Sequence, residues 1–220
     1  MKQASYVVPF VIMLLMSCAG AKKENGSIGG EKTDVYKVNL EAPEGKAVAA
    51  FAEGCFWCSE HIFEAVVGVD SAVSGYAGGM TTDPTYERVN TETTGHAETV
   101  LVYYDPAVID YAELTKVFFT SHDPTTPDQQ GPDRGNSYRS ILFYTTPQEL
   151  DLAVKAKEEF DNSGMFSDPI VTEIKPMDAF YRAEQYHQDY IEHNPYSPYV
   201  LGVSIPRYEK FKMTYKGELK

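Results

Sequence analysis

Residues 54–60 carry the sequence Gly-Cys-Phe-Trp-Cys-Ser-Glu, and this segment joins two patterns of different periodicity. Before it, residues 47–52 form an apolar run typical of a buried strand, and after it residues 61–67 have the apolar spacing of a helix. A turn at glycine therefore delivers Cys55 to a helix N-terminus, where unpaired amides and the helix dipole favour a thiolate over a thiol. Cys58 follows one helical turn later on the same face, so the segment predicts a pair of reactive thiols.

The composition bounds the class of protein. The chain has 220 residues, of which 43% are apolar and 13% aromatic, and this suits one domain with an extension and a sizeable core. Its formal net charge of -13 argues against nucleic-acid binding, which needs clustered Lys and Arg. We find no internal repeat and no linker to a second domain.

The first residues differ from the rest of the chain. Lys2 gives a positive start, and residues 6–16 form an apolar run, interrupted by Pro9, that is too short to span a membrane. Such a run is typical of a signal-peptide core. It ends in Leu-Met-Ser-Cys at Cys18, which resembles the lipobox of bacterial lipoproteins, where the cysteine is lipidated and becomes the N-terminus. The alternative is a general secretory signal with an incidental cysteine at this position.

We therefore expect a signal peptide over residues 1–17, a lipidated Cys18 with a flexible tether over residues 18–34, and a folded domain over residues 35–220. The tether is rich in Gly, Lys and Glu and has no apolar period. The expected location is extracytoplasmic, on a bacterial membrane to which the lipid holds the protein. There the remaining two cysteines can form a disulfide, and a catalytic pair needs a dedicated reductant.

The rest of the chain alternates between strand and helix patterns. Strands are expected over residues 46–53, 69–76, 98–104, 138–144 and 170–175. Helices are expected over residues 55–67, 110–121, 147–163 and 182–193. Residues 122–137 form a loop rich in Pro, Asp, Gln and Gly, and a loop that long is usually functional. The pattern predicts an α+β fold, a two-layer α/β sandwich in which helices pack on a mixed central sheet.

Several short motifs follow one another along this domain. They are Gly-Cys-Phe-Trp-Cys at 54–58, Gly-Tyr-Ala-Gly-Gly at 75–79, Gly-His-Ala-Glu at 95–98, His-Asp-Pro-Thr-Thr at 122–126, Gly-Pro-Asp-Arg-Gly at 131–135, Tyr-Arg-Ser at 138–140, Tyr-His-Gln at 186–188 and Asn-Pro-Tyr at 194–196. Their order and spacing resemble the A-type peptide-methionine sulfoxide reductases from about residue 47 to residue 199. The resemblance implies an α/β sandwich that reduces the S epimer of methionine sulfoxide. No B-type domain is appended, so the R epimer is expected to be left untouched.

Reduction of a sulfoxide needs a soft nucleophile, an acid that protonates the departing oxygen, and a pocket that holds the methyl group. The strand-to-helix turn and the resemblance both make Cys55 the nucleophile. By resemblance, Glu98 is the proton donor, and it must then be desolvated so that it stays protonated near neutral pH. By residue type alone, Glu98 would be interpreted as a solvated carboxylate at a strand edge.

Other candidate residues surround these two. Phe56 and Trp57 are expected to form an apolar cradle for the methyl group, although Phe56 can belong to the core at the same time. By resemblance, Tyr76 and Tyr138 donate hydroxyl hydrogen bonds to the sulfoxide oxygen, since a phenol stays neutral and keeps its geometry. Asp133 is expected to have a positioning role in the long loop.

A histidine near the C-terminal end is assigned to the substrate site as a supporting residue. His187 lies three residues after Glu184 and three residues before Tyr190. Tyr190 is assigned to the substrate site together with His187. Glu-x-x-His can indicate a metal, but carboxylate-bridged sites need two copies and the sequence has one. We therefore expect neither a metal nor a resident cofactor.

Recycling of the nucleophile is assigned to Cys58. Many members of the resembling family carry a resolving cysteine shortly after Asn-Pro-Tyr, whereas here Val200 stands at that place and residues 207–220 contain no cysteine. Cys58 is thus expected to form a disulfide with Cys55, which an extracytoplasmic thioredoxin-like dithiol then reduces. The other expected partners are oxidised proteins, and the protein is expected to be a monomer.

Two other functions use the same Cys-x-x-Cys pair. In thioredoxin-like oxidoreductases the tryptophan usually precedes the first cysteine, whereas here Phe-Trp lies between the two. A metal-binding lipoprotein would need four zinc ligands, and the pair with His61 leaves a gap. Haem attachment needs His directly after the second cysteine, where Ser59 stands. A zinc measurement and an assay with oxidised methionine derivatives would separate the three.

Overall fold

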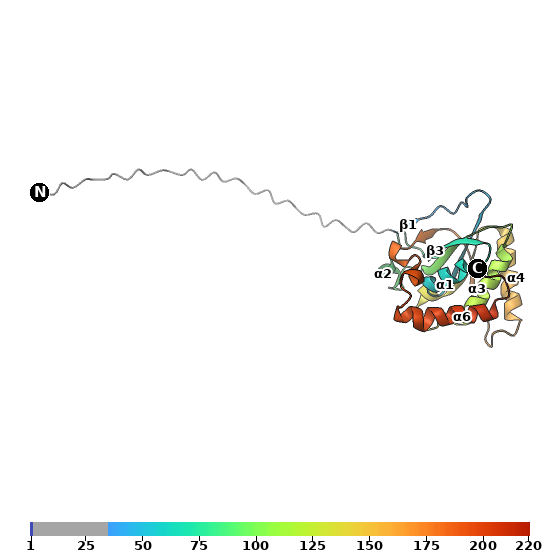
Figure 1. The fold of residues 1–220 in the computed structure, drawn as a ribbon. Coiled ribbons are helices and arrows are strands. Elements are labelled where there is room, and N and C mark those ends of the chain that lie inside the picture. The colour runs from blue at the N-terminus through green and yellow to red at the C-terminus, as the bar shows by residue number, and fades with distance from the viewer. Residues whose placement is uncertain (2–34) are drawn as a thin grey trace. The chain divides into compact units, whose positions relative to one another are not determined.

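The structure, a computed structural model, describes Met1 and residues 35–220 (Figure 1). Residues 35–220 belong to one compact unit. Apart from Met1, the predicted signal peptide, the lipidation site at Cys18 and the tether lie outside the described residues. No helix within residues 35–220 is long and apolar enough to cross a membrane.

A seven-stranded sheet with the order β1-β9-β3-β4-β2-β7-β8 forms the centre of this unit. Its strands are β1 (Tyr36–Lys37), β2 (Ala47–Glu53), β3 (Val69–Ala77), β4 (Ala97–Tyr104), β7 (Ser140–Tyr144), β8 (Glu173–Pro176) and β9 (Phe180–Arg182). Neighbouring strands are antiparallel except for β7 and β8, which are parallel. The predicted mixed sheet is thus confirmed.

Several helices accompany the sheet, of which α1, α3 and α4 pack on it and α6 lies alongside α1 and α3 (Figure 1). The α-helices are α1 (Phe56–Glu64), α2 (Tyr86–Val89), α3 (Tyr111–Ser121), α4 (Pro147–Asp161), α5 (Tyr190–His193) and α6 (Ile205–Thr214). Two 3₁₀ turns, η1 (Asn136–Tyr138) and η2 (Gln185–His187), and a π-helical segment, η3 (Val200–Ser204), complete the helical elements of the described chain.

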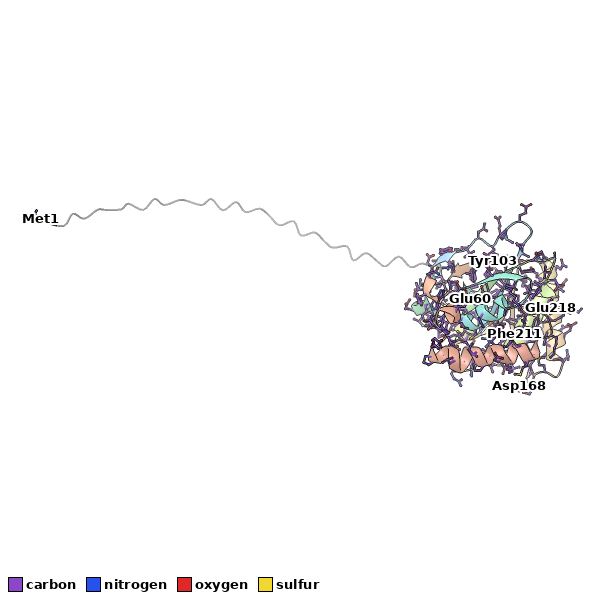
Figure 2. All side chains as sticks on the ribbon, in the orientation of Figure 1. Met1, Glu60, Tyr103, Asp168, Phe211 and Glu218 are labelled. Carbon is purple, nitrogen blue, oxygen red and sulfur yellow. The ribbon has the colours of Figure 1, made fainter. Side chains whose placement is uncertain are left out.

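Strand β2 shows how the sheet is buried on both faces. Its side chains alternate, so that Ala49 and Phe51 join the large core cluster under the helices, while Ala50 and Ala52 join a smaller cluster on the other face. The Phe51 ring stacks on Phe63 of α1, with ring centroids 4.7 Å apart. The large cluster extends to Phe211 of α6, whose side chain is fully buried (Figure 2). This burial fixes the position of α1 on the sheet, and therefore of the cysteine pair.

Helix α4 begins as its sequence predicts. The Thr146 hydroxyl accepts a hydrogen bond from the Glu149 backbone amide, and Pro147 occupies the first helical position. The helix ends at Asp161, slightly before the glycine at position 164 that was expected to stop it, and that glycine adopts a φ of 75°.

The helix expected over residues 182–193 is wrong. The segment instead contains the end of β9, the turn η2 and the short α5. Gln188 is drawn to the sheet, where its side chain accepts from the Ser74 amide and donates to the Ser74 carbonyl. Asp189 adopts a left-handed conformation with φ of 51°, which a continuous helix does not allow. Tertiary hydrogen bonds therefore override the local helical pattern.

The long loop and the C-terminal segment are more structured than expected. Residues 122–137 contain a small hairpin of β5 (Gln129–Gln130) and β6 (Asp133–Arg134). The segment after Asn-Pro-Tyr forms η3 and α6, although no helix was expected there. Both elements lie next to the cysteine pair, as described below.

Candidate active site

The turn between β2 and α1 presents Cys55 as the N-cap residue of the helix. Gly54 makes this turn with φ of 93°, and a Cβ at this position would lie 2.5 Å from the Gln130 Cβ atom. Only glycine fits there, because both the backbone conformation and the close approach exclude a side chain. Cys55 is only 6% exposed, so the residue is buried at this turn.

Glu98 lies beside this cysteine. Its Oε2 atom accepts a hydrogen bond of 3.0 Å from the Phe56 backbone amide, one of the amides left free at the start of α1. Burial raises the pKa of Glu98 to about 8, and this effect outweighs the lowering by the Phe56 amide. The side chain therefore carries a proton at neutral pH, which is the condition for a general acid.

The two cysteines of the described chain are reduced and buried, and their thiols interact. The hydrogen bond from Cys55 lowers the pKa of Cys58 to about 6, helped by the positive charge of Arg207 and by the Ser204 hydroxyl, which lies 3.2 Å from the Cys58 sulfur. Burial and the neighbouring Cys58 raise the pKa of Cys55. The thiolate expected at Cys55 from its place at the helix N-terminus is therefore not favoured, because burial outweighs the helix amides. The two shifts have opposite directions, so the pair favours a thiolate on Cys58 over one on Cys55.

An aromatic wall stands next to the pair. Trp57 stacks on Tyr190 with ring centroids 3.6 Å apart, and its indole N–H donates to His187 Nδ1 at 3.0 Å. The Phe56 ring lies 4.9 Å from the His187 ring. Burial lowers the pKa of His187 to about 4, so the imidazole is neutral and accepts the indole proton. The structure thus brings together all four residues that were expected to line this part of the site.

Two tyrosine hydroxyls lie near the acid and the nucleophile. Burial, followed by the charge of Glu98, raises the pKa of Tyr138, which belongs to η1. Burial also raises the pKa of Tyr86, and the negative charges of Glu98 and Cys55 raise it further. The Tyr86 hydroxyl shares a hydrogen bond with Tyr138. Tyr86 was not predicted from the sequence. Its only local signal is Thr85, a helix N-cap residue directly before it.

Tyr76 does not occupy the place expected of it. Its side chain is fully buried, and its hydroxyl donates to Glu184 Oε2 at 2.9 Å. The other oxygen of Glu184 accepts the Tyr86 backbone amide at 2.9 Å. Because the one hydroxyl proton of Tyr76 is already used, the structure places this residue behind Tyr86 as a support, and not in direct contact with a substrate oxygen as predicted.

Asp133 is held by a residue that follows the Asn-Pro-Tyr motif. The Tyr199 hydroxyl donates to Asp133 Oδ2 at 2.5 Å and lies close enough to Cys55 for the two groups to influence each other's pKa. Burial raises the pKa of Asp133. Tyr199 thus links the loop carboxylate to the nucleophile, a role that was not predicted from the sequence.

A buried ion pair between Glu53 and Arg207 lies directly before the turn that carries Cys55. Glu53, the last residue of β2, accepts a hydrogen bond of 2.7 Å from Arg207 Nη2 and one of 2.6 Å from the Ser121 hydroxyl. Arg207 Nε donates to the Ser121 carbonyl at 2.8 Å. Burial raises the pKa of Glu53 to about 7, although Arg207 opposes the rise. The pair ties α6 to the strand that carries Cys55.

Removing the cation of this pair is expected to destabilise the fold. Arg207→Met leaves the buried Glu53 carboxylate without its cationic partner, which costs about 3–5 kcal/mol of the free energy of unfolding. The loss should be larger at pH 8 than at pH 5.5, because Glu53, with a pKa of about 7, takes up a proton at the lower pH. Urea unfolding at both pH values measures it. The double variant Glu53→Gln/Arg207→Met is the control and should recover part of the loss, and equal losses at both pH values would contradict the assignment.

The described residues offer no metal centre: within 35–220, no three His, Cys, Asp or Glu side chains lie together in a way that could hold an ion. The thiol pair and the buried acid are the reactive groups that the geometry brings together. This arrangement suits attack of a sulfur nucleophile on a group whose leaving atom needs a proton.

Known proteins share this arrangement of sequence and fold. The sequence model of the family described as "Peptide methionine sulfoxide reductase" matches residues 47–219. Peptide methionine sulfoxide reductase MsrA of Natronomonas pharaonis is 49% identical over 163 residues, which cover 74% of this chain and 92% of that protein. Peptide methionine sulfoxide reductase MsrA 1 of Rhodopirellula baltica is 43% identical over 183 residues, covering 83% and 94%.

Solved structures agree with the sequence comparison. Mxr1 from Saccharomyces cerevisiae in reduced form superposes with a TM-score of 0.67 at 37% identity and covers 71% of this chain and 91% of Mxr1. Methionine sulfoxide reductase A of Corynebacterium diphtheriae gives a TM-score of 0.63 at 33% identity, covering 71% and 79%. The chain therefore belongs to the MsrA family of peptide methionine sulfoxide reductases, and the reaction it catalyses is the reduction of methionine sulfoxide.

Proposed function

We propose that this enzyme reduces the S epimer of methionine sulfoxide in oxidised proteins, with Cys55 as the nucleophile and Glu98 as the acid. The observation that supports this assignment best is the buried carboxyl of Glu98, whose pKa is raised to about 8 and which is hydrogen-bonded to the amide that follows Cys55. An uncharged acid is thereby held next to a thiol at neutral pH. A free methionine sulfoxide and a peptide-bound one present the same reacting group, so both are substrates in this proposal.

Substrate binding uses the aromatic wall and the tyrosines. The methyl group of the sulfoxide packs against Phe56 and Trp57, which His187 and Tyr190 hold in place. The oxygen accepts hydrogen bonds from the hydroxyls of two tyrosines. One is Tyr138, as the sequence predicted. The other is Tyr86, whose hydroxyl interacts with that of Tyr138. Tyr86 replaces Tyr76 in this role, because the Tyr76 hydroxyl donates to Glu184.

The first chemical step transfers the oxygen to Cys55. The proton shared by the pair moves from Cys55 to Cys58, and the Cys55 thiolate attacks the substrate sulfur while Glu98 protonates the departing oxygen. The attack forms a bond between the Cys55 sulfur and the substrate sulfur, and the hydroxyl then passes from the substrate sulfur to the Cys55 sulfur as this bond breaks, with its electron pair going to the substrate sulfur. Methionine leaves as the thioether, and Cys55 becomes a sulfenic acid. Tyr199 and Asp133 position the loop beside the reacting sulfur.

The second step regenerates the nucleophile. Cys58 attacks the Cys55 sulfenic acid, water departs, and a disulfide forms between the two. An external thioredoxin-like dithiol then reduces this disulfide, with no resident cofactor in the cycle. The contact between the two thiols and the low pKa of Cys58 support this assignment, because the thiolate is the attacking form.

The choice of epimer is tested with separated methionine sulfoxides. The enzyme, incubated with either epimer and a dithiol, should convert the S epimer to methionine and leave the R epimer unchanged. The measurement is the amount of methionine formed over time. Comparable turnover of the R epimer would contradict the proposal.

The N-terminal residues are proposed to form a signal peptide that ends in a lipobox, with Cys18 as the lipid anchor of an extracytoplasmic protein. The support is the sequence alone, in which a short apolar run ends in Leu-Met-Ser-Cys. Residues 18–34 are then the tether, and the lipid is the contact with the membrane.

Replacing the anchor cysteine is expected to change location and not activity. Cys18→Ala should leave the protein without lipid and uncleaved, and its sulfoxide reduction should remain normal, because the change lies outside the catalytic unit. Membrane fractionation and the mass of the N-terminal peptide measure the effect. An unmodified Cys18 in protein extracted from native membranes would contradict the anchor.

A further inference from the structure

A cavity of about 480 Å³ opens beside the cysteine pair, between α6, η3, the end of α3 and the β5–β6 hairpin. Cys58 lines it together with Asp133, Tyr199, Gly202 and Arg207. Cys55, Trp57, Glu98 and Tyr138 are not among its lining residues. The nucleophile, the acid, Trp57 and Tyr138 therefore lie outside the lining of this cavity, which borders the second sulfur and, through Asp133 and Tyr199, the loop beside the substrate site.

The inner end of the cavity is suited to a sulfur anion. Arg207 uses Nε and Nη2 for Ser121 and Glu53, and its Nη1 lies 3.7 Å from the point that a Cβ at Gly54 would occupy, directly before the cysteine turn. Its guanidinium therefore stays positive and fixed near both sulfurs. Lys210 adds a second positive charge to the lining, and Asp123 and Asp133 bring two carboxyl groups to it. At Cys58 the effect of Arg207 exceeds that of Asp133. A thiolate that enters here, or one that is released here, is stabilised by these positive charges.

The cavity also has the size and surface of a receptor for a short segment of another protein. Its volume is within the range of about 300–1,000 Å³ that is common for ligand pockets. Its lining includes the small or apolar residues Pro132, Gly202, Val203 and Pro206, and the exposed Leu201 lies next to Gly202 in the chain. A loop that carries a reactive cysteine is the occupant that both these apolar residues and the cysteine in the lining favour.

We propose that the thioredoxin-like reductant inserts its active-site loop into this cavity and attacks Cys58, while the sulfoxide approaches Cys55 from the aromatic wall. This inference rests on the proposed Cys55–Cys58 disulfide. It adds the point of attack and the surface that receives the partner. Substrate and reductant then use separate approaches to one pair of sulfurs.

The thiol–disulfide exchange between the reductant and the Cys55–Cys58 disulfide takes two steps. The first thiolate of the reductant attacks the Cys58 sulfur, the Cys55–Cys58 bond breaks, and its electron pair goes to Cys55, which takes up a proton from water. The second thiol of the reductant loses its proton and attacks its own partner sulfur in the mixed disulfide. Cys58 then leaves as a thiolate beside Arg207, and the reductant departs as a disulfide, having supplied two electrons.

Filling the cavity tests the approach. A Cβ at Gly202 meets no atom within 4 Å, so Gly202→Trp places an indole on the cavity lining without a clash at its base. In the full chain, turnover driven by thioredoxin should fall about tenfold or more, whereas methionine released in one turnover without reductant should not change. Met213→Trp is the matched control, because Met213 is exposed on α6 and does not line the cavity. Equal thioredoxin-driven turnover of the two variants would overturn the proposal.

Trapping the mixed disulfide tests the point of attack in the unaltered chain. The full chain is oxidised with one equivalent of methionine sulfoxide and mixed with a thioredoxin that lacks its second active-site cysteine, and the adduct is mapped by peptide mass spectrometry. The adduct should lie on Cys58, with Cys55 free to be alkylated, and an adduct on Cys55 would overturn the inference. If no methionine or disulfide forms beforehand, the proposed function itself fails, so the two failures are distinguishable.

Discussion

Glu98→Gln is expected to slow the release of methionine by about a hundredfold or more, since the loss of a general acid typically costs this much. Glutamine keeps the size of the side chain, and its amide oxygen can still accept the Phe56 amide that Glu98 accepts now. It cannot deliver a proton to the departing oxygen. The measurement is the single-turnover rate of methionine formation in the absence of reductant.

The pH dependence of the same rate gives an independent test. In the wild type the rate should fall as the pH rises through about 8, because Glu98 has a raised pKa of about 8 and loses the proton that it donates. The rate should also fall below about pH 6, because Cys58 is then protonated. A protonated Cys58 cannot accept the proton that Cys55 must lose before it attacks. Glu98→Gln should lack the high-pH limb and retain the low-pH limb. A variant that keeps both limbs and a near-normal rate would exclude Glu98 as the acid.

Alkylation of the thiols serves as the control for this variant. If Glu98→Gln only removes the acid, Cys55 should still react with a generic thiol reagent at a rate close to that of the wild type. A loss of thiol reactivity together with turnover would mean that the variant disturbs the cysteine turn itself, and then the slower rate would not report on proton transfer.

The part of the fold that holds the nucleophile is predictable because its signals are local. The apolar run of β2, the glycine turn and the amphipathic α1 follow one another in the chain, and the structure reproduces them almost residue for residue. Their periodicities are strong, and no distant contact opposes them. The start of α4 is predictable for the same reason, since Thr146 and Pro147 specify it locally.

The elements that were missed depend on contacts between distant parts of the chain. Residues 182–193 have a helical pattern, yet Glu184 is held by Tyr76 and Tyr86, and Gln188 pairs with the backbone of β3. Helix α6 is polar on most of its surface and buries one ring, that of Phe211, so its apolar period is weak. No spacing rule reveals such elements in a single sequence.

The residues of the candidate site also differ in how far the sequence alone could predict them. Cys55 and Trp57 lie in one compact motif, and the residue types within it indicate their chemistry. Glu98 was assigned only by the resemblance of its motif to the family, because its residue type alone indicates a solvated carboxylate. Tyr86 and Arg207 lie outside such motifs, and they are recognised only when the chain has brought them to the acid and to the cysteine pair. Tyr76 lies in a clear motif, but the role predicted from that motif does not agree with the structure, because its hydroxyl donates to Glu184.

Cys58→Ser is expected to stop thioredoxin-driven turnover after about one methionine per enzyme, since the sulfenic acid on Cys55 then has no internal thiol to attack it. The two residues are spaced three apart, which places their Cβ atoms about 5–6 Å apart on a helix, whereas a disulfide needs about 3.5–4.5 Å. Because Cys55 is the N-cap residue and not a helical one, a small movement of the first turn brings the sulfurs together.

The substitution should therefore change recycling and leave the stoichiometry of the first step intact. Serine keeps the size of the side chain and the hydrogen bond with Ser204, so the turn should remain folded. The first methionine should form more slowly than in the wild type, because serine cannot accept the proton that Cys58 takes from Cys55. A small thiol, which can reach the sulfenic acid directly, should restore part of the turnover. Peptide mass spectrometry after one turnover should show a Cys55–Cys58 disulfide in the wild type and a trapped sulfenic acid in the variant. Sustained thioredoxin-driven turnover by Cys58→Ser would mean that Cys55 is reduced directly and that Cys58 is not the resolving residue.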